Sequence, residues 1–165
     1  MEEKEETAVH CDVYESPIGA LWLTSDGKAL TKIVMNREVP KDVASDPILE
    51  RAKQWLDDYF RGQPRNVDFP LAPEGTAFQK MVWQLLLDIP WGAVSTYGDL
   101  ARDMARLLGK EKMSAQAIGQ AVGANPIAIL IPCHRVVGAK GKLTGYAYGL
   151  DKKIWLLDHE RNDCV

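Results

Sequence analysis

The segment Ile129-Leu130-Ile131-Pro132-Cys133-His134-Arg135-Val136-Val137 joins two apolar runs through a proline, a thiol and an imidazole. The apolar residues before Pro132 predict a short buried strand or extended segment. Pro132 fixes φ and removes a backbone donor, so regular strand pairing should stop there. A cysteine held between two buried runs is positioned rigidly, as a nucleophile must be. Buried cysteines are also ordinary inert core residues, so Cys133 by itself leaves both interpretations open.

The composition around this segment is that of a globular protein, with 46% hydrophobic and 26% charged residues. No apolar run approaches the roughly 20 residues that a membrane helix needs. The first six residues, Met1–Glu6, are acidic and lack the apolar region of a signal peptide. These features predict a cytoplasmic protein with no membrane contact.

Cysteine and histidine spacing argues against disulfides and metals. The chain has three cysteines, Cys11, Cys133 and Cys164, an odd number that does not form a disulfide framework. Adjacent residues such as His10 and Cys11 rarely both reach one ion, and the usual four-ligand zinc spacing is missing. We therefore expect no metal site and no cofactor.

Charge is distributed unevenly along the chain. Residues 1–73 hold 9 Lys/Arg and 14 Asp/Glu, a net charge of −5, whereas residues 74–165 hold 11 and 9, a net charge of +2. If nucleic acid binds, the second half should bind it.

The first half predicts an α/β roll over residues 1–72, a small antiparallel sheet covered by one helix. Strands are expected at 7–14, 20–25 and 29–35, with Asp26-Gly27 as a hairpin signal between the last two. A helix should begin near Pro47, capped by Ser45 or Asp46, and end at Gly62. The proline-rich stretch 63–75 indicates a domain boundary.

The second half, 73–165, predicts a mostly helical domain of the winged helix-turn-helix kind, which makes the whole chain α+β. Helices are expected at 77–88, 97–108 and 115–123, with a last helix capped by Asp151 and running through Glu160. A short turn containing glycine joins the second and third of these helices, which is typical of a helix-turn-helix. Small residues cover the third helix and would let a backbone or a nucleic-acid groove approach closely; they include Ala115, Ala117 and Gly119.

Several motifs between Gly75 and Glu160 resemble the O6-alkylguanine-DNA alkyltransferase family, the methylated-DNA–protein-cysteine methyltransferases. They are Gly75-Thr76-Ala77-Phe78-Gln79, Val82-Trp83, Ile89-Pro90, Ser95-Thr96-Tyr97-Gly98, Asn125-Pro126, Pro132-Cys133-His134-Arg135, Leu143-Thr144-Gly145-Tyr146 and Trp155-Leu156-Leu157-Asp158-His159-Glu160. The first half matches mainly in Ser16-Pro17-Ile18-Gly19.

The resemblance implies a monomeric DNA repair protein that acts on double-stranded DNA. It implies transfer of an alkyl group, chiefly methyl, from O6 of guanine (or from O4 of thymine) to Cys133. Because a thioether is a very poor leaving group, each molecule should react once. The helix 115–123 looks like the helix that enters the minor groove, where the target nucleotide is flipped out of the stack.

Further roles follow from the same resemblance. An ordinary cysteine has a pKa of about 8.5 and needs a base; His134 should act through a bridging water and Glu160 should orient it. Asn125 is similar to the hinge residue that ties the helix end to the cysteine segment. Tyr97 resembles the residue that contacts the 3′ phosphate. Tyr146, Ala147 and Tyr148 correspond to the pocket loop.

Two positions depart from the family pattern. Gln116 replaces the usual arginine that fills the gap left by the flipped base, so we expect weaker flipping. The candidates for the positive charge that contacts DNA phosphates are then Arg102, Arg106 and Lys112. Tyr148 stands where many relatives have glycine, and should narrow the alkyl pocket to methyl and small groups.

Three other protein classes compete with this interpretation. An alkyltransferase-like protein binds alkylated DNA without transfer, but such relatives generally lack the cysteine. A winged-helix transcription regulator would need a longer and more basic recognition helix. A cysteine protease or acyltransferase would need an oxyanion hole, and no motif suggests one.

Overall fold

The computed structural model describes residues 10–38 and 43–161. The chain divides into two compact units between Pro73 and Glu74. Its elements mix one antiparallel sheet with five α-helices in the described ranges, so the predicted α+β class is confirmed.

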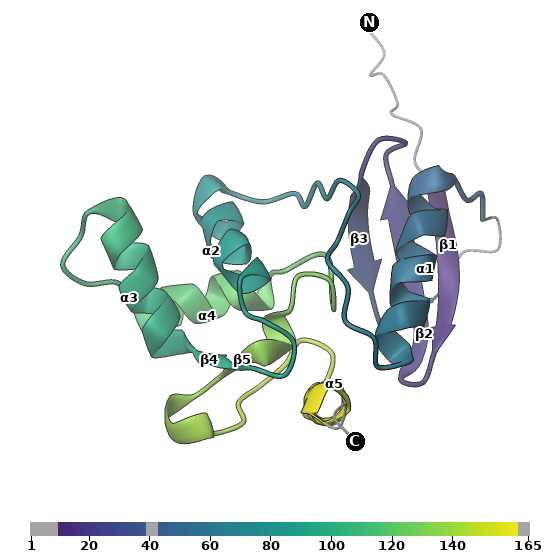
Figure 1. Cartoon of the computed structure of the whole chain (residues 1–165). Helices are drawn as coiled ribbons and strands as arrows, with labels where there is room; N and C mark the ends of the chain where they lie inside the picture. Colours follow the sequence, from purple (N-terminus) through teal and green to yellow (C-terminus); the bar gives the residue numbers. More distant parts are fainter. Residues whose placement is uncertain (1–9, 39–42, 162–165) are drawn as a thin grey trace, which may run out of the picture. The chain divides into compact units, whose positions relative to one another are not determined.

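The first unit is a three-stranded antiparallel sheet with one helix. The strands are β1 (His10–Ser16), β2 (Gly19–Ser25) and β3 (Leu30–Val34), in the order β1-β2-β3 (Figure 1). Ser16 pairs with Gly19 across a tight turn, where Gly19 has a φ of +112° that favours glycine. The expected start of the first strand, residues 7–9, lies outside the described residues.

Helix α1 (Pro47–Phe60) packs on this sheet. Its N-terminus is capped by Asp46, whose carboxylate accepts a hydrogen bond from the backbone N–H of Leu49 at 2.8 Å. One face of α1 is buried against the sheet, and this face consists of Ile48, Leu49, Ala52, Trp55, Leu56 and Tyr59. The sheet and α1 therefore enclose one apolar core, which contains Leu21, Leu23 and Ile33.

The second unit begins with α2 (Ala77–Leu87), α3 (Tyr97–Leu108) and α4 (Ala115–Gly123). Thr76 and Gln79 form a reciprocal capping box at the start of α2. Gly109 ends α3 in the left-handed conformation, with a φ of +68°. Both α2 and α3 pack against α4, and the indole N–H of Trp83 donates to the carbonyl of Ala121 at 2.8 Å. The predicted helix-turn-helix is thus formed by α3 and α4.

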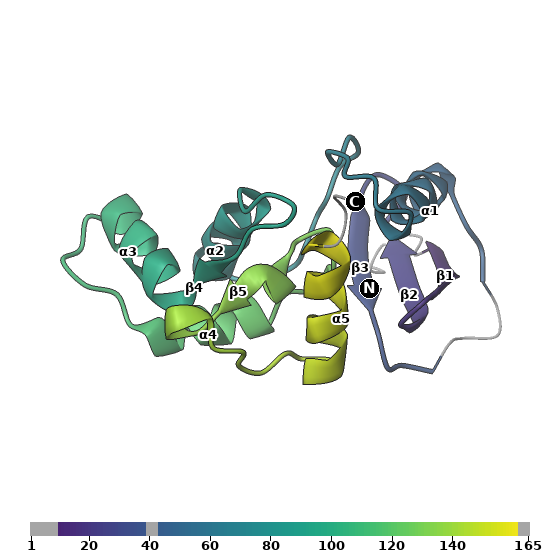
Figure 2. The same ribbon diagram turned by 60° about the horizontal axis from the view of Figure 1, so that its bottom comes forward.

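The remaining elements of this unit surround the cysteine segment. They are β4 (Ser95–Thr96), the 3-10 helix η1 (Cys133–Arg135), β5 (Val136–Val137), the 3-10 turn η2 (Ala139–Gly141) and α5 (Leu150–Arg161). Strands β4 and β5 pair in parallel, side by side in Figures 1 and 2. This pairing holds the residues after Cys133 beside the start of α3.

Two sequence-based expectations are wrong in this unit. The apolar run before Pro132 is not extended: the Leu130 N–H bonds to the Ala128 carbonyl at 2.8 Å, and Ile129 has a φ of +72°. After Pro132, Cys133 opens the 3-10 helix η1. Asp151 is not the cap of the last helix, because α5 already begins at Leu150 and Asp151 lies in its first turn.

Candidate active site

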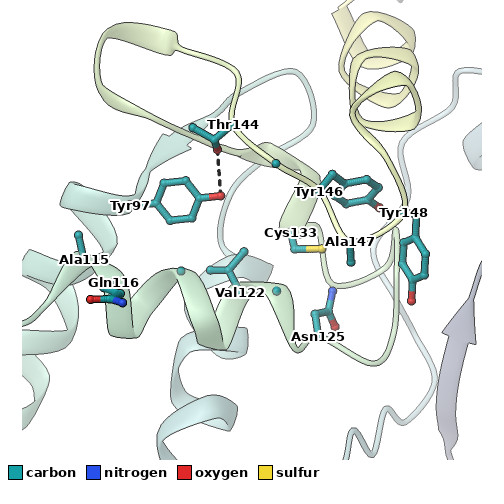
Figure 3. A pocket seen from close by; sticks show the side chains of 13 residues that line it. Tyr97, Ala115, Gln116, Val122, Asn125, Cys133, Thr144, Tyr146, Ala147 and Tyr148 are labelled. Carbon is teal, nitrogen blue, oxygen red and sulfur yellow. Dashed lines mark hydrogen bonds between the residues drawn. The ribbon is translucent and has the colours of Figure 1, made fainter.

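Cys133 lies at the inner end of a pocket of about 530 Å³, within the usual range for ligand sites. Its side chain is 7% exposed. The sulfur lies between the C-terminal end of α4, which leads to Asn125, and the loop that carries Tyr146 and Ala147 (Figure 3). Gln116 is at the opposite end of α4. The pocket therefore runs along α4 from Gln116 to the thiol.

Asn125 ties the end of α4 to the segment before the thiol. Its amide nitrogen donates to the Ile131 carbonyl at 2.7 Å, and its amide oxygen accepts from the Ile127 N–H at 3.0 Å. Both bonds are buried, so each polar group would be costly to leave unpaired. These contacts hold the turn that contains Ile129 in its left-handed conformation.

A buried carboxylate lies behind the thiol. Glu160, 2% exposed on α5, accepts a hydrogen bond from His134 Nε2 at 2.6 Å. It also accepts from Arg135 Nε at 2.8 Å and Arg135 Nη2 at 3.1 Å. Arg135 Nη1 donates to the Ile89 carbonyl at 2.6 Å. Glu160 thus joins α5 to η1 through both His134 and Arg135, and its contact with Arg135 is a buried ion pair.

The protonation of this pair follows from its hydrogen bonds. Burial alone would raise the pKa of Glu160, but the bonds from His134 and Arg135 lower it to about 2. Glu160 is therefore a carboxylate, which only accepts hydrogen bonds, so His134 Nε2 must carry a proton. Burial lowers the pKa of His134, which keeps the ring neutral and leaves Nδ1 as an acceptor. Nδ1 is buried and has no hydrogen-bond partner within residues 10–38 and 43–161. The ring therefore presents a free basic nitrogen.

The thiol itself is held in its neutral form at rest. Burial raises the pKa of Cys133, whereas a hydrogen bond from Asn125 and the positive charge of Lys153 act in the opposite direction. No hydrogen bond joins Cys133 directly to His134 in the described part of the chain, which is consistent with proton transfer through an intervening water. The arrangement is that of a nucleophile with a nearby base and a carboxylate that orients the base.

Most of the site residues predicted from the sequence meet at this pocket. Lining it are Tyr97, Ala115, Gln116, Gly119, Asn125, Cys133, Tyr146, Ala147 and Tyr148. His134, which follows Cys133 in the chain, and its partner Glu160 lie in the protein interior, and Ala117 does not line the pocket.

Four lining residues were missed from the sequence: Val122, Gly123, Thr144 and Gly145. Thr144 donates to the Tyr97 hydroxyl oxygen at 3.2 Å, shown by the dashed line in Figure 3. Its place in the Leu143-Thr144-Gly145-Tyr146 motif was the available signal. The Thr144 bond fixes the Tyr97 hydroxyl and leaves its proton free to be donated to another group.

Helix α4 carries no Lys, Arg, Asp or Glu. The two arginines suggested as phosphate contacts are engaged within α3, where Arg102 pairs with Asp99 and Arg106 with Asp103 at 3.3 Å. These pairs are exposed and therefore weak, so the arginines can exchange partners at low cost. Lys112 has no ion pair in the described residues and stands in the turn before α4.

No cluster of three or more His, Cys, Asp or Glu side chains that could hold a metal occurs among the described residues. Within the same ranges, no helix has the length and hydropathy to cross a membrane.

Comparison with known proteins matches both units of the chain to domains of one protein family. Residues 77–162 match the family model for the DNA-binding domain of 6-O-methylguanine DNA methyltransferase, and residues 9–73 match the model for its ribonuclease-like domain. A methylated-DNA–protein-cysteine methyltransferase of Methanosarcina acetivorans is 45% identical over 154 residues, which cover 90% of this chain and 96% of the relative. A protein of the same name from Haemophilus influenzae is 40% identical over 162 residues, with 94% and 88% covered.

Solved structures agree with these matches. The crystal structure of the O6-methylguanine methyltransferase of Mycobacterium tuberculosis superposes with a TM-score of 0.81 at 38% identity, covering 96% of each chain. The structure of Mycobacterium tuberculosis OGT in complex with DNA gives the same TM-score and identity, with 93% of this chain and 94% of that chain covered. The similarity extends over both units of the chain.

Proposed function

The chain belongs to the 6-O-methylguanine DNA methyltransferase family, and from this membership we propose that Cys133 is the sulfur that receives the alkyl group. The protein repairs DNA by alkyl transfer from O6 of guanine to a cysteine, the activity predicted from the sequence. The observation that carries the assignment to Cys133 is its position at the inner end of the pocket, beside the His134–Glu160 pair.

The reaction balances with these groups alone. The thiol proton passes to Nδ1 of His134 through water, and the sulfur attacks the methyl carbon of O6-methylguanine. An S–C bond forms, the C–O6 bond breaks, and its electron pair remains on the guanine. The proton then neutralises the guanine, so a thiol and O6-methylguanine become S-methylcysteine and guanine. Glu160 stabilises the imidazolium that forms in between.

Access to the pocket requires the base to leave the DNA stack, because O6 of a stacked guanine cannot reach a buried sulfur. We assign the small-residue face of α4 to the minor groove; Ala115 and Gly119, four residues apart, share this face, whereas Ala117 points to another side of the helix. Tyr97 would contact the phosphate beside the flipped nucleotide through its free hydroxyl proton. Gln116, at the entrance end of the pocket, would hydrogen-bond the orphaned cytosine.

The pocket loop would hold the flipped base and its alkyl group. Tyr146 and Tyr148 pack edge to face with ring centroids 5.7 Å apart, and both line the pocket. A tyrosine pair in this place favours methyl over bulky alkyl groups. A free thiol as acceptor, together with a DNA substrate, fits the reducing cytoplasm as the proposed compartment.

Intact mass after incubation with an O6-methylguanine duplex, followed by peptide mapping, tests the assignment. One methyl group on Cys133, never more than one per molecule, is the expected result. Cys133→Ser should gain no mass, whereas the control Cys11→Ser, which changes a half-buried cysteine in the first unit, should react normally. Tight binding to the duplex with no mass change would instead indicate a lesion-binding protein without transfer.

A further inference from the structure

Lys153 is a buried cation without a buried anion. Its side chain, on α5, is 0% exposed, whereas lysine is almost never fully buried unless it is paired. No carboxylate lies within ion-pair distance of its ammonium in the described structure, and the buried carboxylate of the same helix, Glu160, pairs with Arg135. The ammonium therefore keeps an unpaired positive charge in the interior, at a considerable desolvation cost.

The two hydrogen bonds of Lys153 connect the strand that follows the Cys133 segment to the loop that lines the pocket. Its Nζ donates to the Val136 carbonyl at 2.6 Å and to the Gly145 carbonyl at 3.3 Å. Val136 follows η1, which carries Cys133, and Gly145 begins the loop that lines the pocket. An ammonium has three N–H groups, so these two carbonyls leave one donor unassigned.

We propose that Lys153 is a positioning residue for methyl transfer. Its ammonium holds the Gly145 loop against the Cys133 segment, and its positive charge stabilises the thiolate form of Cys133. This inference rests on the proposed role of Cys133 as acceptor. It explains why a lysine occupies a buried position at which an apolar residue would cost less.

The electrostatics of the pocket agree with this geometry. Burial lowers the pKa of Lys153, and the negative charge of ionised Cys133 raises it again. The charged and titratable groups around the sulfur are His134 and Arg135 on η1, Tyr146 and Tyr148 on the loop, and Lys153 and Glu160 on α5. The charge of Arg135 is balanced by Glu160, and His134 is neutral. Within this set, Lys153 is therefore the group whose positive charge no carboxylate balances.

The first test measures ionisation of Cys133 without DNA, from the thiolate absorbance as a function of pH. Lys153→Met, which keeps the length of the side chain, should raise the pKa of Cys133 and slow methyl transfer at pH 7 by about tenfold or more, with the loss shrinking as pH rises. Lys153→Arg should keep the thiol titration near that of the unmodified protein and change mainly the duplex concentration that gives half of the maximal single-turnover rate, because the loop contact is altered. Lys152→Met, on the partly exposed neighbouring residue, is the matched control and should change neither quantity.

A purely structural lysine gives another pattern. Lys153→Met would then lower the Tm while the titration of Cys133 stayed unchanged, and this result would overturn the inference. If the unmodified protein takes no methyl group, the proposed function fails, but the thiol titration still reports on Lys153.

A second measurement needs no variant of Lys153. If the ammonium of Lys153 favours ionisation of Cys133, the thiolate must equally favour the charged form of Lys153. Removing the thiolate should therefore lower the pKa of Lys153. In protein labelled at lysine Cε, NMR titration should show a lower pKa for Lys153 after S-methylation of Cys133 than before. The same pKa in both states would refute the coupling, whether or not Lys153→Met folds.

Discussion

Replacing Glu160 by glutamine separates the structural from the chemical role of the buried carboxylate. The change keeps the shape of the side chain but removes the charge that faces Arg135, whose side chain is only 10% exposed. An uncompensated buried charge costs about 3–5 kcal/mol. At about 2–4 °C per kcal/mol for a chain of this size, the Tm should fall by roughly 10 °C. Asp158→Asn, an exposed change on the same helix, should alter stability by less than about 0.5 kcal/mol.

A second substitution tests whether the loss of activity follows from the loss of stability. Arg135→Met in the Glu160→Gln background removes both charges and should restore most of the Tm. The Ile89 carbonyl then lacks its donor, which leaves a deficit of about 1–3 kcal/mol. Methyl transfer should remain slowed by about a hundredfold or more in both variants, because the imidazolium of His134 has no carboxylate to stabilise it.

Two assays decide the matter, thermal unfolding and the single-turnover rate with a duplex carrying labelled O6-methylguanine. If the double variant regains its transfer rate together with its Tm, Glu160 acts only through stability, and its role as orienting group is refuted.

The stabilisation that the Glu160 carboxylate provides should depend on pH, and acid unfolding measures this dependence. The pKa of Glu160 falls from an ordinary 4.5 to about 2 on folding, so its stabilisation is complete above pH 4.5. The difference in stability between the unmodified protein and Glu160→Gln should therefore shrink as pH falls from 4.5 towards 2.

Three further outcomes are expected from the pocket and from α4. Tyr148→Gly should speed reaction with O6-benzylguanine by at least about tenfold, because it removes a ring from the pocket wall; an unchanged rate would show that Tyr148 does not restrict the alkyl group. Gln116→Arg should tighten duplex binding and steepen its dependence on salt by about one counterion, measured by fluorescence anisotropy; a similar gain in Gln120→Arg, also exposed on α4, would show that the effect is not specific to the pocket entrance. Single-turnover rates should stay level as pH falls to 6.5 and decline only below it, because burial lowers the pKa of the His134 base; a half-maximal rate above pH 6.5 would contradict a buried neutral imidazole.

The regular elements were predictable because their signals are local. Thr76 and Gln79 form the capping box that marks the start of α2, and Gly109 adopts the left-handed conformation that ends α3. The apolar face of α1 repeats at helical spacing, so its packing on the sheet follows from the sequence.

The segment before the nucleophile was not predictable in the same way. An isoleucine strongly favours extended backbone, yet Ile129 has a φ of +72°, a conformation that Asn125 stabilises by hydrogen bonds to residues on both sides. Tertiary contacts override local preference there. Lys153 gave no signal either, because in the sequence it looks like one of two adjacent lysines on a surface helix, and only the fold shows that it is buried.

The burial of Cys133 also bears on how long a molecule lasts in the cell. A protein that reacts once is lost if its sulfur meets a peroxide, a quinone or a stray alkylating metabolite before it meets DNA. A buried neutral thiol reacts slowly with such compounds, since the thiolate is the nucleophile. The same burial that demands a base for catalysis thus protects each copy from oxidants and bystander electrophiles until a damaged base enters.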